Sequence, residues 1–121
     1  MANPLDSFRW DNRLLLIHVE SPEEARAVIG EFEAAAGEVD DRDLLWFIAD
    51  PEDLHTNKPE SLEDSLRDRI HDLVSAQELP DERVRLIGKD GGIKGRYERL
   101  DLPAVFARID SMPMRRAEMG K

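Results

Sequence analysis

Histidines and carboxylates follow the first two apolar runs of the chain, and these side chains can bind divalent metals or act as general acids and bases. The first run, 13–19, reads "RLLLIHV", and the second, 43–49, reads "DLLWFIA". If both runs form neighbouring parallel strands, their carboxyl ends meet at one edge of a sheet, where open α/β sheets bind ligands. The residues that would meet there are His18, Glu20, Asp50, Glu52 and His55.

The spacing of these residues is a weak basis for a metal or hydrolytic site. His18 and Glu20 stand at positions i and i+2 of a strand, and 50–58 is a polar connection that we expect to be mobile. Residue types alone do not establish geometry. A histidine and carboxylate site, with or without a divalent metal, is therefore the alternative rather than the leading interpretation. His71 falls on an amphipathic helix, and we expect it at the surface or its boundary.

A glycine-rich stretch at 86–97, "LIGKDGGIKGRY", raises the question of phosphate binding. A phosphate loop needs G-x-x-x-x-G-K-[ST] ahead of a helix, but here no Ser or Thr follows either lysine and another strand comes next. The tetrapeptide "KDGG" supplies an aspartate and two residues that accept positive φ. The pattern therefore predicts a β-hairpin turn, whose backbone amides could still hold an anion.

The segment "MPMRR" at 112–116 allows two interpretations. It could be a docking surface, because arginine binds carboxylates and phosphates in bidentate fashion. It could also be a C-terminal segment packed on the core, with methionine filling gaps. We favour packing, because pairs of surface arginines usually contribute little.

The composition excludes several classes of protein. The 121 residues carry a formal net charge of −10, which disfavours nucleic acid and anionic membranes as partners. Cysteine is absent, which excludes thiol redox catalysis and thiolate metal sites, and we expect no cofactor. No apolar run approaches the ~18 residues of a membrane-spanning helix. The start lacks the features of a signal peptide, so the default location is the cytoplasm, or the periplasm or outside the cell if a leader has been removed.

Hydrophobic periodicity predicts elements in the order β-α-β-α-β-β-α. Ser21, Pro22 and Glu24 form a helix-start signal of N-cap, N1 proline and capping box, and Gly37 is a plausible stop. The predicted strands are 13–19, 43–49, 84–88 and 93–100, and the predicted helices are 21–37, 61–76 and 101–112.

This order predicts a single α/β domain over residues 1–121, with a mixed four-stranded sheet. The first β-α-β unit requires parallel strands and a right-handed crossover. The thioredoxin core has this element order, with sheet order 2-1-3-4 and an antiparallel third strand. Strand 43–49 would then lie at an edge with no charge in its middle. Unless the segment before residue 13 covers it, we expect a two-fold dimer that buries this edge.

Three motifs carry a family resemblance. "LDSFRWDNRLLLI", "RLIGKDGGIK" and "IDSMPMRRAEM" resemble an uncharacterised domain family, nicknamed P-DUDES, with a peroxiredoxin-like, thioredoxin-type fold and relatives among secreted sushi-repeat proteins. The resemblance spans nearly the whole chain and implies this fold, but no reaction. Thioredoxin-type chemistry needs cysteine at the first strand–helix junction, where this chain has "ESPEE" at 20–24.

A thioredoxin-type topology brings three distant segments to one end of the sheet, opposite the usual thioredoxin active site. These are the start of the first strand, the hairpin turn and the end of the last helix. We expect Asp90 or Asp110 to accept hydrogen bonds from Arg115 or Arg116, with Trp10 or the methionines packed beneath. The candidate binding or structural cluster is Trp10, Arg13, Lys89, Asp90, Asp110, Arg115 and Arg116.

The sequence thus favours a non-catalytic binding or structural module with a thioredoxin-like architecture. Its partner would be another protein or a second copy, since the basic spot made by Lys89 and the two arginines could take an anion or an acidic partner. The alternative is a carboxylate and histidine enzyme at the carboxyl edge of the sheet. Fold alone does not decide between these functions.

Overall fold

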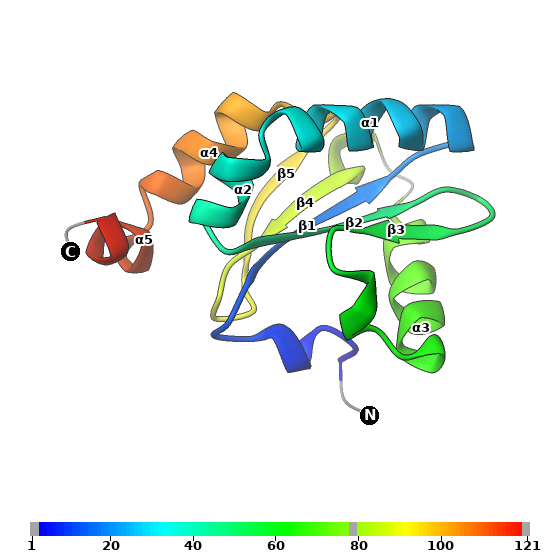
Figure 1. The fold of residues 1–121 in the computed structure, drawn as a ribbon, viewed down its shortest axis with the longest axis horizontal. Helices are drawn as coiled ribbons and strands as arrows, with labels where there is room; N and C mark the ends of the chain where they lie inside the picture. The colour runs from blue at the N-terminus through cyan, green and yellow to red at the C-terminus, as the bar shows by residue number, and fades with distance from the viewer. Residues whose placement is uncertain (1–2, 78–79, 120–121) are drawn as a thin grey trace.

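A central sheet lies between two layers of helices in the computed structural model, which describes residues 3–77 and 80–119 (Figure 1). The strands are β1 (Arg13–His18), β2 (Leu44–Ala49), β3 (Leu54–Thr56), β4 (Val84–Ile87) and β5 (Ile93–Tyr97). The α-helices are α1 (Pro22–Ala34), α2 (Ala36–Asp41), α3 (Asp64–Ser75), α4 (Leu102–Asp110) and α5 (Pro113–Met119). Short 3-10 turns are η1 (Asp6–Phe8), η2 (Pro59–Ser61) and η3 (Pro80–Glu82).

The sheet has the order β3-β2-β1-β4-β5. Strands β1 and β2 are parallel, and the other neighbours are antiparallel. The order predicted for the four strands is confirmed. The prediction of a four-stranded sheet was wrong, because the connection after β2 turns back and adds β3 as a fifth strand.

The edge of β2 is covered, contrary to the sequence-based prediction. The polar connection 50–58, expected to be mobile, contains β3, which pairs with residues 47–49 of β2. Beyond β3, the side chain of Asn57 continues the pairing: its Oδ1 accepts the Trp46 N–H at 3.0 Å and its Nδ2 donates to the Leu44 carbonyl at 3.1 Å. The reason given for a dimer, an open strand at 43–49, therefore does not hold.

Replacing Asn57 with alanine should destabilise the domain by about 2 kcal/mol, because it leaves two backbone groups of β2 without their partner. Asn57→Asp should cost more at neutral pH, since aspartate still accepts from Trp46 but sets a charged oxygen against the Leu44 carbonyl. Urea unfolding followed by circular dichroism measures both. Equal losses for the two variants would contradict the assigned roles of the amide oxygen and nitrogen.

Each face of the sheet has its own core, because side chains alternate between faces along a strand. One face carries Leu15, Trp46 and Leu86 and packs beneath α1, α2 and α4. Phe32 of α1 stacks on Trp46 with ring centroids 4.8 Å apart. The other face carries Leu16, Phe47 and Ile87 and packs on α3 and the N-terminal segment.

The helix boundaries follow the capping signals in part. Ser21 caps α1 as predicted, with its hydroxyl accepting the Glu24 N–H at 3.1 Å. Gly37 does not stop the helix. The break comes at Ala35, and the chain then forms α2 because Val39 must still reach the core, where it is 2% exposed.

The C-terminal segment forms a separate helix that was not predicted from the sequence. Helix α4 ends at Asp110, and Pro113 begins α5, a position where proline is favoured because its missing N–H is not needed. Met112, between the helices, is 8% exposed and belongs to the core beneath α4. The prediction that methionine packs on the core holds for Met112, whereas Met114 is 43% exposed.

Candidate functional site

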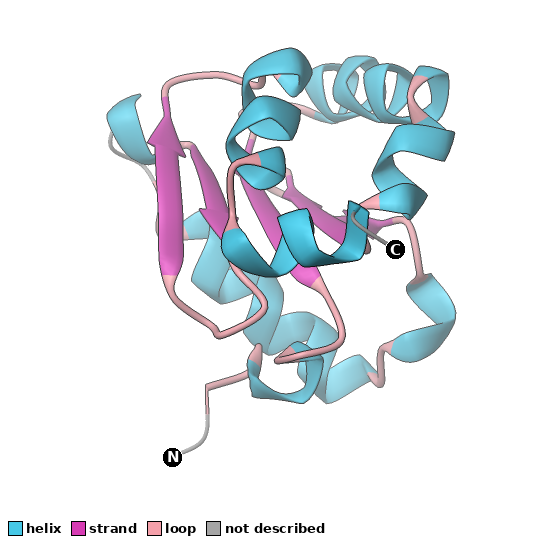
Figure 2. Cartoon of the chain, turned by 90° about the vertical axis from the view of Figure 1, so that its left-hand side faces the viewer, coloured by secondary structure: helices cyan, strands magenta, loops and turns pink. Residues whose placement is uncertain are grey.

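The start of β1, the β4–β5 turn and α5 meet at one end of the molecule, which we call the pole; Figure 2 views the molecule from this end. Arg13, at the first position of β1, is 1% exposed. Its Nη1 and Nη2 donate to the two carboxylate oxygens of Glu118 at 3.3 and 3.2 Å. Lys89 of the turn donates to Glu118 at 2.9 Å and to Asp43 at 2.9 Å. Glu118 thus joins helix, strand and turn.

A second group of ion pairs holds the other end of α5. Arg115, 5% exposed, donates from Nε to Asp110 at 3.1 Å and from Nη2 to Asp41 at 2.5 Å. Arg42 donates to both oxygens of Asp110, at 3.1 and 2.8 Å, and its guanidinium lies 4.5 Å from the ring centroid of Phe106. These two groups form the pole network: Arg13, Arg42, Lys89 and Arg115 with Asp41, Asp43, Asp110 and Glu118.

The predicted hydrogen bond is present between Asp110 and Arg115, one of the pairs that the prediction allowed, and the other candidates have different surroundings. Asp90 pairs with Lys94 at 3.0 Å rather than with an arginine. Arg116 is exposed and forms no ion pair with the described residues. Trp10 does not pack beneath the network: it is 61% exposed, with φ 73°, although its N–H donates to the Lys89 carbonyl at 2.7 Å.

Sequence reasoning missed the carboxylates that complete the network, notably Glu118. The available signal was the spacing of Arg115 and Glu118 at i and i+3 after Pro113, which places both side chains on one face of a short helix. That signal required the helix α5 to be predicted first.

The network keeps its acids ionised. Burial opposes ionisation of Glu118, but hydrogen bonds from Arg13 and Lys89 hold its pKa below the usual value. The hydrogen bonds from Arg42 and Arg115 likewise hold the pKa of Asp110 below its usual value. The four cations and four carboxylates of the pole network balance in formal charge. Because Arg115 and Glu118 pair with residues outside α5, we call the network an ionic clamp on this helix.

A pocket of about 300 Å³, the pole pocket, lies between the β4–β5 turn and the α4–α5 junction. Met112 and Met114 line one side of it. Among the described lining residues, Asp90 is the only carboxylate, whereas the cations are Arg13, Lys89, Lys94 and Arg108. The pocket wall therefore has an excess of positive charge on a chain whose formal net charge is −10.

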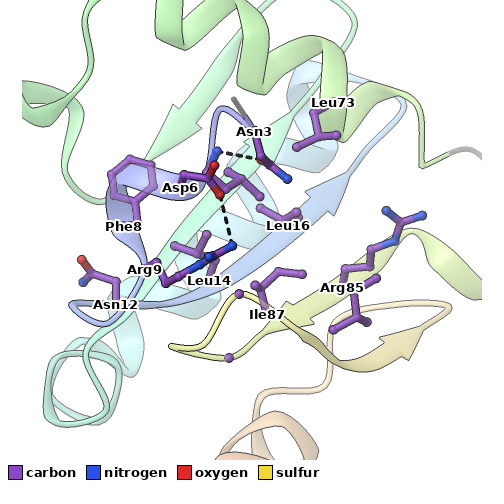
Figure 3. Close-up of a pocket in the computed structure, with 14 residues that line it drawn as sticks. Asn3, Asp6, Phe8, Arg9, Asn12, Leu14, Leu16, Leu73, Arg85 and Ile87 are labelled. Carbon is purple, nitrogen blue, oxygen red and sulfur yellow. Dashed lines mark hydrogen bonds and ion pairs between the residues drawn. The ribbon is translucent and has the colours of Figure 1, made fainter. Parts of the chain in front are cut away.

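A second pocket, of about 190 Å³, lies among the N-terminal segment, β1, β4 and α3; we call it the side pocket (Figure 3). Leu14 and Leu16 of β1 line it, together with Leu73 of α3. Arg9 lies at its mouth and is bonded to Asp6 at 3.3 Å. Sequence reasoning missed this pocket, because a space left between elements has no residue pattern of its own.

The histidines and carboxylates at the carboxyl edge of the sheet form only a partial cluster. Asp50, 2% exposed, lies 2.7 Å from His55 Nε2, and its other oxygen accepts the N–H groups of Glu52 and Asp53. Although burial opposes it, these hydrogen bonds keep the pKa of Asp50 below its usual value. His71 is half-buried, as expected for a boundary residue, and its Nε2 lies 2.7 Å from the Asp50 carbonyl oxygen. The cluster thus fixes the turn between β2 and β3 against α3.

His18 and Glu20 do not join this cluster. Glu20 pairs with Arg83 at 2.6 Å. His18 Nδ1 is buried without a hydrogen-bond partner in the described part of the chain. No group of three or more histidine and acidic side chains within residues 3–77 and 80–119 is placed to hold a metal ion, so His18, Glu20, Asp50 and His55 do not assemble into the metal site considered as the alternative.

Fold and sites define a small single α/β unit with an open mixed sheet. The chain matches, over residues 4–118, the family described as Domain of unknown function (DUF4174), and it belongs to that family. Neither the curated proteins nor the solved structures that were compared with the chain gave a match. Within the described ranges, no helix combines the length and the apolar composition that crossing a bilayer requires.

Proposed function

We propose that the chain is a non-catalytic, thioredoxin-like binding module whose pole pocket takes an acidic group of a partner protein. The order β2-β1-β4-β5, with β4 antiparallel to β1 and α1 between the two parallel strands, supports the thioredoxin-like assignment. The absence of cysteine supports a role other than thiol redox chemistry. On this scaffold, the pole replaces the carboxyl edge as the site of recognition.

The observation that carries the proposal is the charge of the pole pocket. Four cations and one carboxylate line it in the described structure. Two of the cations, Arg13 and Lys89, are already bonded to carboxylates of the pole network. The other two lie outside the network. Among the described residues, Arg108 donates to the neutral oxygens of Lys94 and Ser111, and Lys94 pairs with the exposed carboxylate of Asp90 at 3.0 Å.

The apolar part of the pocket suits a protein partner. Met112, Pro113 and Met114 form a wall beside the cations, and methionine adapts its shape to different side chains. A carboxylate carried on an aliphatic stem, such as a glutamate side chain, would contact Arg108 with its oxygens and the methionines with its stem. Arginine matches this planar anion in bidentate geometry.

A short polyglutamate peptide should bind the protein. The double variant with Lys94→Gln and Arg108→Gln should weaken that binding by about tenfold or more. The reason is that these two cations are the ones not neutralised inside the pole network. Isothermal titration calorimetry measures the affinity, and added salt should reduce it because the contacts are exposed.

The matched control is Arg26→Gln, which removes an exposed arginine on α1 that pairs with exposed Glu23 at 3.6 Å. It should change the affinity by no more than about twofold. If Arg26→Gln weakens peptide binding as much as the substitutions at Lys94 and Arg108 do, the binding reflects general charge attraction and the pole pocket is not the site. Unchanged binding in the pocket variants would also reject it.

A further inference from the structure

The side pocket has an apolar floor that belongs to neither the pole network nor the proposed partner site. Leu14, Leu16 and Ile87 extend from β1 and β4 and are at most 6% exposed, and Leu73 of α3 forms the far wall (Figure 3). Helix α3 packs against β1, β2 and β3. The pocket lies between α3 and the N-terminal segment, and its floor is formed by side chains of the sheet.

One guanidinium lies at the mouth of the side pocket. Arg9 lies against the β4–β5 turn at Gly91, whose φ is +88°. A Cβ at Gly91 would come within 2.9 Å of Arg9 Nε and would displace the arginine side chain, and the positive φ itself favours glycine at this position. The carboxylate partner of Arg9 is Asp6, at 3.3 Å, and both side chains are nearly half exposed. Such an exposed pair is weak and easily replaced.

The other charged groups limit which ligand could use this guanidinium. Arg85 also lines the pocket; its Nη2 is bonded to Glu82 at 2.9 Å, and its buried Nε has no hydrogen-bond partner among the described residues. A dianion such as phosphate would meet the negative charges of Asp6 and Glu82 beside these two arginines, which disfavours it. A monocarboxylate needs only one guanidinium, and its two oxygens match the planar donors of Arg9. Asn3 and Asn12 also belong to the lining; Asn3 Oδ1 accepts the Leu5 N–H, and Asn12 Nδ2 donates to the Asp43 carbonyl.

We propose that the side pocket binds a small monocarboxylate with an apolar ring or branched chain. The apolar body would rest on Leu14, Leu16 and Ile87, and the carboxylate would replace Asp6 on Arg9. The volume of about 190 Å³ fits this size, since an engineered apolar cavity of about 150 Å³ binds benzene. This site is separate from the proposed acidic-peptide site, although both border the β4–β5 turn.

The test uses benzoate, benzyl alcohol and acetate as probes on the full chain, with dissociation constants measured by titration calorimetry and by NMR shifts of the leucine methyl groups. Benzoate should bind about tenfold or more tightly than either other probe, because only benzoate combines the ring with the charge. Equal affinity for benzoate and acetate would overturn the proposal, since charge alone would then account for binding. So would equal affinity for benzoate and benzyl alcohol.

Two substitutions separate the roles of the mouth and the floor. Arg9→Met keeps an aliphatic stem but removes the guanidinium, so it should remove the preference for benzoate and leave benzyl alcohol within about twofold. Leu73→Phe fills the far wall and should weaken both ring-bearing probes; Ile93→Phe, which narrows the mouth from β5, serves as the second filling variant. Arg26→Met, on the opposite face, is the matched control and should change nothing.

The results for these variants decide whether the side pocket is the binding site. If Arg9→Met weakens benzoate no more than Arg26→Met does, Arg9 is not the carboxylate ligand and the proposal fails. It also fails if neither filling variant weakens the ring-bearing probes, or if Arg9→Met weakens benzoate and benzyl alcohol equally. The double variant at Lys94 and Arg108 should bind benzoate normally, which keeps this test independent of the one for the pole pocket.

Discussion

Replacing Glu118 with glutamine is expected to lower the free energy of unfolding by about 3 kcal/mol, because it leaves a buried arginine without its counter-ion. Arg13 is 1% exposed and donates to both oxygens of Glu118. Lys89, with its side chain 9% exposed, loses one of its two carboxylates in the same change. Glutamine keeps one acceptor oxygen where glutamate has two, and it cannot neutralise a guanidinium. Denaturant unfolding at neutral pH measures the loss.

The pH dependence gives this prediction a second readout. Hydrogen bonds keep the pKa of Glu118 lower in the folded state than its ordinary value of 4.5. The stabilisation is therefore complete above that ordinary value and is lost as the pH falls through the lower folded-state value. The wild-type protein should lose stability over this acidic range more steeply than Glu118→Gln, so the two stabilities should converge in acid.

Two further variants test the physical cause. Glu33→Gln, which changes an exposed glutamate on α1, should be nearly neutral, within about 0.5 kcal/mol. Replacing Arg13 and Glu118 together by methionine removes the buried charge as well as its partner, and should recover part of the loss. If Glu118→Gln behaves like Glu33→Gln, the clamp contributes nothing to stability.

The parts of the fold that sequence predicts best are those where pattern and burial agree. The runs 13–19 and 43–49 are continuously apolar because β1 and β2 are buried on both faces, and this leaves little choice of structure. Strand β3 was missed because it has only three residues. Beyond it, the side chain of Asn57 rather than a strand backbone bonds the edge of β2. The pairing of β3 depends on the exposed backbone edge of β2, and the local sequence of 54–56 does not encode that long-range contact.

The site was predictable only as a meeting of segments. Topology alone brought Arg13, Lys89 and Asp110 to one pole, because strand direction determines where each turn lies. It could not assign partners, since several cations and several carboxylates meet at the pole and topology does not say which of them pair. Asp90 bonds Lys94 on the next strand, four residues away, and local contacts of this kind compete with the long-range pairs that topology suggests.

Ending the chain after Ser111 is expected to lower the melting temperature by about 10 °C or more, which corresponds to roughly 2.5 kcal/mol or more in a domain of this size. The truncation removes Met112, which is 8% exposed in the core beneath α4, together with Arg115 and Glu118. Thermal unfolding followed by circular dichroism measures the shift, with a chain ending after Met112 as the comparison.

The comparison separates two causes of stabilisation by α5. A chain ending after Met112 keeps the apolar contact and loses only the ionic clamp, so the difference between the two truncated chains reports the burial of Met112, worth about 2 kcal/mol. The loss from the clamp should be smaller here than in Glu118→Gln, because without α5 water reaches Arg13 and Lys89 and hydrates their charges. A point substitution at Glu118 should therefore cost more than the ionic part of deleting the whole helix. The opposite order would mean that α5 stabilises the pole by covering it rather than by charge pairing, and an unchanged melting temperature in both truncated chains would remove its stabilising role altogether.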